Sequence, residues 1–174
     1  MNISGQRDLL IFIVQLLSRH QIEYLLTGSF AVSYYGIPRA THDIDFIVEV
    51  TSDSVTRFQN AMKSLGKAFV VDIQRIESAA KEHSLFNIYH LETGIKIDFW
   101  IIDADDFHQK KKRSVTVPFD TQNIHFISAE DLILNKLVWC REVMSERHMR
   151  DCVGIVEIQR EKLDANICIA GQKT

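Results

Sequence analysis

Polar and apolar residues alternate in two short segments of the sequence, which is typical of β-strands with one buried face. In Asp43–Val48 (DIDFIV) two acids alternate with apolar side chains, and Ile95–Ile101 (IKIDFWI) repeats the same pattern. Because side chains two residues apart in a β-strand share a face, Asp43 and Asp45 are predicted to lie together on one face of their strand. Asp98 is predicted to lie opposite the apolar face of its own strand in the same way.

If these two strands are neighbours, three carboxylates converge on one side of a sheet. Adjacent carboxylates repel each other and stay ionised at little cost only where cations lie between them. Mg²⁺ is the usual cation, because it binds a few carboxylates and completes its coordination with water and phosphate oxygens. Asp43, Asp45 and Asp98 are therefore the predicted catalytic residues, and the predicted ligands of two Mg²⁺ ions that act on an in-line phosphoryl displacement.

Gly28 and Ser29 supply a second element, and thirteen residues separate Ser29 from Asp43. A glycine lets the backbone come close to a ligand. The helix predicted to follow over residues 30–36 offers free N–H groups to a phosphate at its N-terminus, and the Ser29 hydroxyl adds a further donor. Each pair is a weak signal alone, but their order and spacing together indicate a phosphate-binding site beside the acids.

The remaining segments mix helical and strand patterns without regular βαβ order, which indicates an α/β (α+β) fold with a mixed sheet. Residues 1–127 are predicted to form a core and 128–174 a helical C-terminal lobe, packed as one compact unit. The tail 161–174 is predicted to be weakly ordered. The predicted helices cover 5–20, 30–36, 52–65, 74–82, 103–112, 129–143 and 147–160, and the predicted strands 22–26, 44–50, 68–71, 85–91, 95–102 and a smaller pair, 115–119 and 124–127.

Composition narrows the class of protein. A chain of 174 residues with 46% apolar and 25% charged residues is a globular domain, and its net charge of -3 weighs against a general nucleic-acid coat protein. Cys140, Cys152 and Cys168 form no CxxC pair, which favours reduced thiols in the cytoplasm over disulfides or a zinc site. No apolar run is long enough for a membrane span, so no membrane partner is expected.

The motif Leu26-Thr-Gly-Ser29, then Asp43-Ile-Asp45, then Asp98 resembles that of the DNA polymerase beta-like nucleotidyltransferase superfamily. The stretch Gly36–Asp45 (GIPRATHDID) is similar to a small bacterial branch that includes toxins of abortive-infection-type toxin–antitoxin pairs. The resemblance covers roughly residues 20–155. It implies a polymerase beta-like core and transfer of a nucleoside monophosphate from an NTP to an acceptor hydroxyl, with Mg²⁺ as cofactor, RNA or tRNA as acceptor and an antitoxin protein as partner.

The same resemblance implies that Gly28 and Ser29 bind the NTP phosphates, and that an active-site Lys and Asp of the second lobe correspond to Lys136 and Asp151. The arginine that often follows the Gly-Ser pair in related minimal nucleotidyltransferases is missing. Arg39, Lys136 or Arg150 would therefore have to help bind the triphosphate.

Helical spacing places Lys136 on the apolar side of its helix, where a lysine needs a partner. Either an ion pair that only supports the fold or a phosphate of the substrate satisfies that requirement, and Asp151 is the candidate acid. The basic run Lys110–Arg113 is either a solvated helix end or a patch for an RNA acceptor.

Three alternative functions stay open at this stage. An antibiotic-modifying nucleotidyltransferase shares the Gly-x and Asp-x-Asp core, and an acidic acceptor pocket would favour it over RNA. A non-catalytic nucleotide-binding or interaction module is the second alternative, against which the retention of all three acids counts. A purely structural domain is the third.

Overall fold

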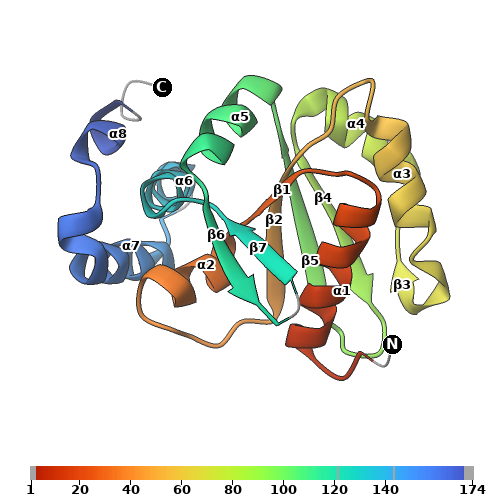
Figure 1. Cartoon of the computed structure of the whole chain (residues 1–174), viewed down its shortest axis with the longest axis horizontal. Helices are drawn as coiled ribbons and strands as arrows, with labels where there is room; N and C mark the ends of the chain where they lie inside the picture. The colour runs from red at the N-terminus through yellow and green to blue at the C-terminus, as the bar shows by residue number, and fades with distance from the viewer. Residues whose placement is uncertain (1–2, 121, 143, 171–174) are drawn as a thin grey trace.

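The computed structural model describes residues 3–120, 122–142 and 144–170, and these build one seven-stranded sheet in the order β3-β4-β5-β2-β1-β7-β6 (Figure 1). The sheet is mixed as predicted, because β2 pairs with β5 and β1 with β7 in parallel while the other neighbours are antiparallel. The strands are β1 (Tyr24–Leu26), β2 (Asp43–Glu49), β3 (Phe69–Val70), β4 (Leu85–His90), β5 (Lys96–Ile102), β6 (Val115–Phe119) and β7 (Gln122–Phe126).

The helices follow the predicted segments closely. The bounds are α1 (Gln6–Arg19), α2 (Gly28–Tyr35), α3 (Val55–Lys63), α4 (Gln74–Glu82), α5 (Ala104–Arg113), α6 (Ala129–Glu142), α7 (Glu146–Gln159) and α8 (Ala165–Ala170), with two 3-10 turns, η1 (Gly66–Ala68) and η2 (Arg160–Lys162). The helix α6 begins with a serine cap, since Ser128 Oγ accepts a hydrogen bond from the backbone N–H of Asp131 at 3.1 Å. None of the helices in the described ranges combines the length and apolarity needed to cross a membrane.

The two faces of the central strands are covered by different helices. Phe99 of β5 packs against Phe58 of α3 with ring centroids 5.4 Å apart. Its neighbour Trp100 points to the opposite face and packs against Trp139 of α6, at 5.1 Å. Figure 1 shows α3 and α4 on one side of the molecule and α6, α7 and α8 on the other. The C-terminal helices therefore lie over the face that carries the acids.

Three expectations need correction. The strands β6 and β7 are not a separate pair, because β7 joins the main sheet through Leu26 and Phe126. The helix α2 begins at Gly28 rather than at residue 30, with Thr27 as its N-cap. The tail is structured as far as Ala170, the last residue of α8. The turn before α8 is anchored by the Asp164 N–H, which donates a hydrogen bond to Glu130 Oε1 at 2.9 Å.

Two other expectations stay open. The end of the predicted helix 129–143 and the end of the predicted tail are untested, because Val143 and residues 171–174 lie outside the described residues. The division of the chain at residues 127 and 128 stays a prediction.

Candidate active site

The two acid-bearing strands are neighbours in the sheet, which was the condition for their acids to converge. In the parallel register of β2 and β5, Asp45 lies directly beside Asp98 and Asp43 lies beside Lys96. All four side chains point to the α6 face of the sheet, because each lies an even number of residues from its neighbours on the same strand. The two strands thus place three acids and one lysine on a single patch. Asp98 is 4% exposed.

Gly28 has a role that the sequence motif does not reveal. Its φ is +60°, a backbone conformation that side chains disfavour. A Cβ atom at this position would lie 1.9 Å from Oδ2 of Asp45. The Thr27 N–H also donates a hydrogen bond to the backbone carbonyl of Asp45, at 2.9 Å. The close approach that Gly28 permits is therefore to the acid itself, and it brings the first turn of α2, with the buried Ser29, against the acidic patch.

The acids strongly perturb one another. Burial, together with the charges of Asp98 and Asp43, raises the pKa of Asp45 to about 6. Burial also raises the pKa of Asp98, although the nearby Lys96 ammonium acts in the opposite direction. The patch therefore holds negative charge at a cost that an added cation would remove.

Lys96 is the residue of this patch that the sequence analysis missed. Its Nζ lies 2.7 Å from Oδ2 of Asp98. Burial disfavours its charge, but the bond to Asp98 and the field of the acids outweigh that effect and raise the pKa of Lys96. The alternation in residues 95–101 could have identified Lys96, because Lys96 and Asp98 share a strand face just as Asp43 and Asp45 do.

The acids of this patch carry the type of oxygen ligand that a hard divalent cation prefers. Oδ1 of Asp98 is buried and has no hydrogen-bond partner among the described residues, so one oxygen of this carboxylate is left for a ligand. Carboxylate oxygens are the ligands that Mg²⁺ prefers. Within the described ranges, no three His, Cys, Asp or Glu side chains stand grouped as a ready-made metal site. Asp43, Asp45 and Asp98 therefore share one strand face without forming a complete metal site, and their role as metal ligands stays a prediction.

A second cluster joins the C-terminal helices to the loop before β2. Lys136 of α6 is 2% exposed, and its Nζ donates to Oδ2 of Asp151 on α7 at 2.9 Å. Arg39 also donates to both oxygens of Asp151, at 3.0 and 3.1 Å. These two cations outweigh the effect of burial and lower the pKa of Asp151. The charge of Lys136 also lowers the pKa of Asp45, so the field of this cluster reaches the acidic patch.

The structure brings together Arg39, Lys136 and Asp151, the three predicted nucleotide-binding residues outside the Gly-Ser pair. Arg150, which was also considered for the triphosphate, is exposed on α7 and makes no contact with this cluster among those described. The buried lysine is thus paired with an acid, as its position requires.

The basic run at the end of α5 is largely occupied by ion pairs. Lys110 pairs with Asp106, Lys111 lies 3.9 Å from Glu23, and Arg113 pairs with Asp131 at 2.7 Å. These contacts favour the interpretation of this segment as a helix end that supports the fold over that of an RNA-binding patch.

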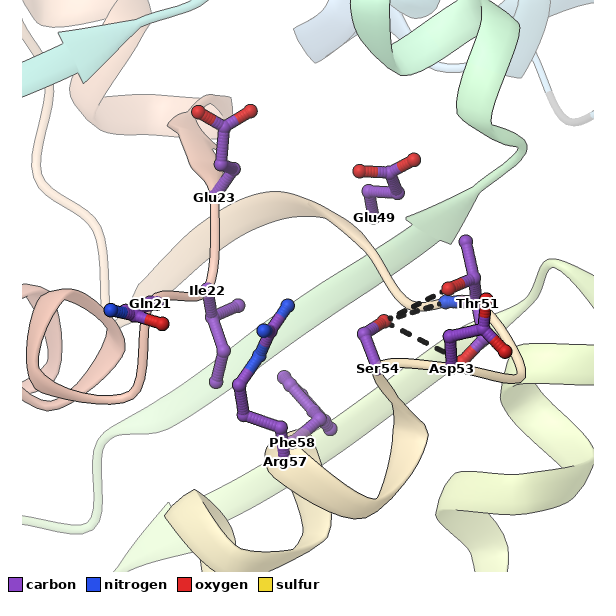
Figure 2. A pocket seen from close by; sticks show the side chains of 9 residues that line it. All are labelled: Gln21, Ile22, Glu23, Glu49, Thr51, Asp53, Ser54, Arg57 and Phe58. Carbon is purple, nitrogen blue, oxygen red and sulfur yellow. Dashed lines mark hydrogen bonds between the residues drawn. The ribbon is translucent and has the colours of Figure 1, made fainter.

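A small polar pocket lies elsewhere, at the opposite end of β2 from Asp43. Figure 2 shows its lining, which includes Glu23, Glu49 and Arg57, and in which the Thr51 N–H donates a hydrogen bond to Ser54 Oγ. The cavity measures about 190 Å³. Because β2 runs from Asp43 to Glu49, about 20 Å at 3.3 Å per residue, this pocket is separate from the acidic patch.

Solved structures of similar fold define the class of protein. The antibiotic-resistance factor ANT(2'')-Ia, in complex with adenylyl-2''-tobramycin, superposes with a TM-score of 0.65 at 14% identity, covering 97% of either chain. The lincosamide antibiotic adenylyltransferase LnuA, bound to lincomycin, gives 0.59 at 17% identity over 91% of this chain and 99% of the other. A nucleotidyltransferase-like protein from Paracoccidioides brasiliensis gives 0.57 at 15% identity over 87% of this chain and 75% of the other. The fold is that of a nucleotidyltransferase.

The family follows from the sequence. The profile of the AbiEii nucleotidyl transferase toxins of type IV toxin–antitoxin systems matches residues 12–170, so the chain belongs to this family. A search of curated proteins finds no match. The predicted resemblance is thereby confirmed.

Proposed function

We propose that the protein transfers a nucleoside monophosphate from an NTP to an acceptor hydroxyl, with release of pyrophosphate, in the manner of EC 2.7.7 enzymes. The observation that carries the proposal is the parallel register of β2 and β5, which sets Asp45 beside Asp98 with Asp43 next in line. A solvated strand end would not bury Asp98 or raise the pKa of Asp45 to about 6. Perturbed acids grouped with a helix N-terminus are typical of a catalytic site.

Each residue has a role in this scheme. Asp43, Asp45 and Asp98 would hold two Mg²⁺ ions, which supply positive charge for the phosphates and the leaving pyrophosphate. Asp98 would also accept the proton of the acceptor hydroxyl through its free Oδ1. The backbone N–H groups of Gly28 and Ser29 would bind the β- and γ-phosphates. Lys136 and Arg39 would place positive charge beside the triphosphate, with Asp151 fixing both side chains.

We further propose that the acceptor is RNA or tRNA, and that the protein acts as the toxin of a pair whose antitoxin suppresses it. Family membership supports this choice, because the matched family is described as a toxin of type IV systems. The buried free thiols of Cys140 and Cys152 fit a reducing cytoplasm. An antibiotic acceptor is the second candidate. It is favoured by the whole-chain likeness to ANT(2'')-Ia and LnuA, both described as acting in antibiotic resistance or modification.

The test is a transfer assay with each of the four α-³²P-labelled NTPs in Mg²⁺, offered total RNA, tRNA, tobramycin and lincomycin in parallel. We expect label in RNA, and none when EDTA replaces Mg²⁺ or when Asp45 is changed to Asn. Label in an antibiotic alone would replace RNA by the second candidate. No label in any acceptor, from protein with a native circular dichroism spectrum, would refute nucleotidyl transfer.

A matched pair of glycine variants tests the geometry. Gly28→Ala and Gly94→Ala both place a side chain at positive φ, +60° and +66°, but only the first meets Asp45, while the second meets open space. Both variants therefore share the backbone strain, on the order of 1–2 kcal/mol. We expect Gly28→Ala alone to abolish transfer. Equal activities would show that the contact between Gly28 and Asp45 has no part in the reaction.

A further inference from the structure

An apolar groove lies on the outer side of the C-terminal helices. It measures about 760 Å³, and Met149, Val153 and Gly154 of α7 form part of its lining. Ile37, from the loop before β2, and Met144, from the connection between α6 and α7, add further apolar surface. Ile37 is 59% exposed and Met144 is 91% exposed. Because monomeric proteins seldom gather exposed apolar side chains in one place, this groove indicates a binding surface.

The helix α7 is apolar on two sides, and the fold uses only one of them. Asp151 and Ile155 lie on the inner side and are buried against the rest of the protein. Met149, Val153 and Val156 lie on the outer side, and each is close to half exposed. Their spacing of four and then three residues is typical of a stripe that packs against a second helix. Figure 1 shows α7 at the end of the molecule farthest from α3 and α4.

Two opposite charges stand on either side of the middle of this groove. Arg150 and Glu157 both line it, and both are exposed. They are seven residues apart, or about 10 Å along the helix, which is too far for them to pair with each other. Among the residues that the structure describes, neither forms an ion pair. Both charges are therefore open to a partner that carries the reverse pattern.

A second copy of the chain carries that reverse pattern when its α7 runs antiparallel to the first. In a two-fold symmetric dimer the same surface of each copy forms the contact. With the axis between Val153 and Gly154, Arg150 and Glu157 each lie three and a half residues from it. Arg150 of one copy then lies opposite Glu157 of the other, and symmetry repeats the pair. The charges of the groove are thus complementary to themselves.

We propose that this groove is the interface between two copies of the chain, which pack their α7 helices antiparallel. Val153 and Ile37 of each copy form the apolar centre, and the two Arg150–Glu157 pairs flank it. An apolar groove with one acid for each base does not suit the phosphates of a nucleic acid. A different protein would have no need to match the charges of this helix to themselves. The inference does not depend on the proposed nucleotidyl transfer.

Sedimentation equilibrium tests the inference on the unmodified chain. We expect the mass to rise from 20.1 kDa towards twice that value between about 1 and 200 µM, the range in which small interfaces associate. The mass should level off there, because a two-fold contact closes on itself. A mass of one chain at every concentration, or a mass that keeps growing beyond two chains, would overturn the inference.

Charge reversal tests the antiparallel arrangement. Arg150→Glu and Glu157→Arg each place like charges opposite each other twice, so either change alone should raise the dimer Kd about 10-fold or more. Mixing the two variants in equal amounts should restore association, because every pair across the interface is then of opposite sign. The double variant with both changes in one chain should also dimerise. Failure of both the mixture and the double variant to associate would overturn the inference.

A matched pair of lysine substitutions tests which side of α7 forms the contact. Val153→Lys places a charge at the centre of the groove and should raise the dimer Kd about 30-fold or more. Ile158→Lys is the control, because Ile158 is an exposed side chain of the same helix but lies about 140° around it from Val153. The control should dimerise like the wild type. Equal Kd values for the two variants, each with a native circular dichroism spectrum, would also overturn the inference.

Discussion

The two faces of the β2–β5 pair are built from alternate residues of the same strands, yet they have opposite characters. On one face Phe46 and Phe99 stack with centroids 5.7 Å apart, and Phe58 of α3 closes over Phe99. On the other face lie Asp45 and Asp98, with Lys96 bonded to one oxygen of Asp98. We call them the dry face and the acid face.

Within each of these strands, the residues of the dry face stabilise the fold and those of the acid face form the candidate site. The dry face contributes hydrophobic burial and holds no charge, whereas the acid face holds buried charge and an unpartnered carboxylate oxygen, which oppose folding. Functional sites commonly carry such a cost, and the rest of the fold must offset it. Matched substitutions on the two faces should therefore have different, and in one case opposite, effects on stability.

The largest effect is expected on the dry face. Phe99→Ala removes a ring that is 0% exposed and should lower the free energy of unfolding by about 3–5 kcal/mol. Trp100→Ala, one residue along on the acid face, removes a larger but half-buried ring and should cost about 2 kcal/mol or less. Urea denaturation of both variants gives the comparison. Equal losses would show that the two faces support the fold alike.

The second effect comes from the charge cluster next to the acid face. Asp151→Asn leaves the ammonium of Lys136, 2% exposed, without its acid and should cost about 3 kcal/mol. Asp131→Asn is the matched control, because its acid is equally buried but its partner Arg113 is 30% exposed and can turn to water. We expect the control to lose about 1 kcal/mol by thermal or urea denaturation. Lys136→Met should also be mild, since Arg39 keeps two bonds to Asp151.

Most of the fold could be predicted from the sequence, because its strongest signals are local. The alternation in residues 43–48 and 95–101 fixed which side chains are buried, and Ile44, Phe46, Ile97 and Phe99 are all 0% exposed. The helix α6 was recognisable from its apolar pattern. The extension of the sheet by β7 was missed, because a parallel pairing joins segments about a hundred residues apart and leaves no local trace.

The acids of the candidate site could be predicted from the sequence, but the contacts of most of its basic residues could not. A lysine in an alternating strand is as typical of a solvated edge as of an ion pair, so Lys96 gave no distinct signal. The fork that Arg39 forms on Asp151 joins residues from a loop and from α7, and their proximity depends on the packing of the C-terminal helices. Lys136 was the exception, because a lysine on an apolar helix side requires a partner.

One substitution on the acid face should raise stability instead of lowering it. Asp45→Asn removes a carboxylate whose burial and acidic neighbours raise its pKa to about 6 from an ordinary 3.8. In EDTA at pH 7 the variant should be more stable than the wild type by about 2–3 kcal/mol, the equivalent of that shift, while transfer is lost. Thermal denaturation measures the gain, and a variant less stable than the wild type would contradict it.

The pH dependence of this gain follows from the same shift. An acid with a raised folded-state pKa binds its proton more tightly in the folded protein, so its ionisation lowers stability as pH rises from about 4 to about 6. The advantage of Asp45→Asn should therefore be small below pH 4, grow through this window and level off above it. A constant advantage from pH 4 to pH 7 would show that repulsion among the acids is not its source.

The smallest expected effect tests what holds the acid face together without a metal. Lys96→Met keeps the side-chain stem but removes the ammonium 2.7 Å from Asp98, and in EDTA it should lower stability by about 1–2 kcal/mol because a buried carboxylate loses its partner. Lys96→Arg should lose less. Mg²⁺ should recover most of the loss in the methionine variant, since a bound cation neutralises the same acids. An equal loss with and without Mg²⁺ would mean that Lys96 supports only the fold, and that the acid face does not accept the cation its acids predict.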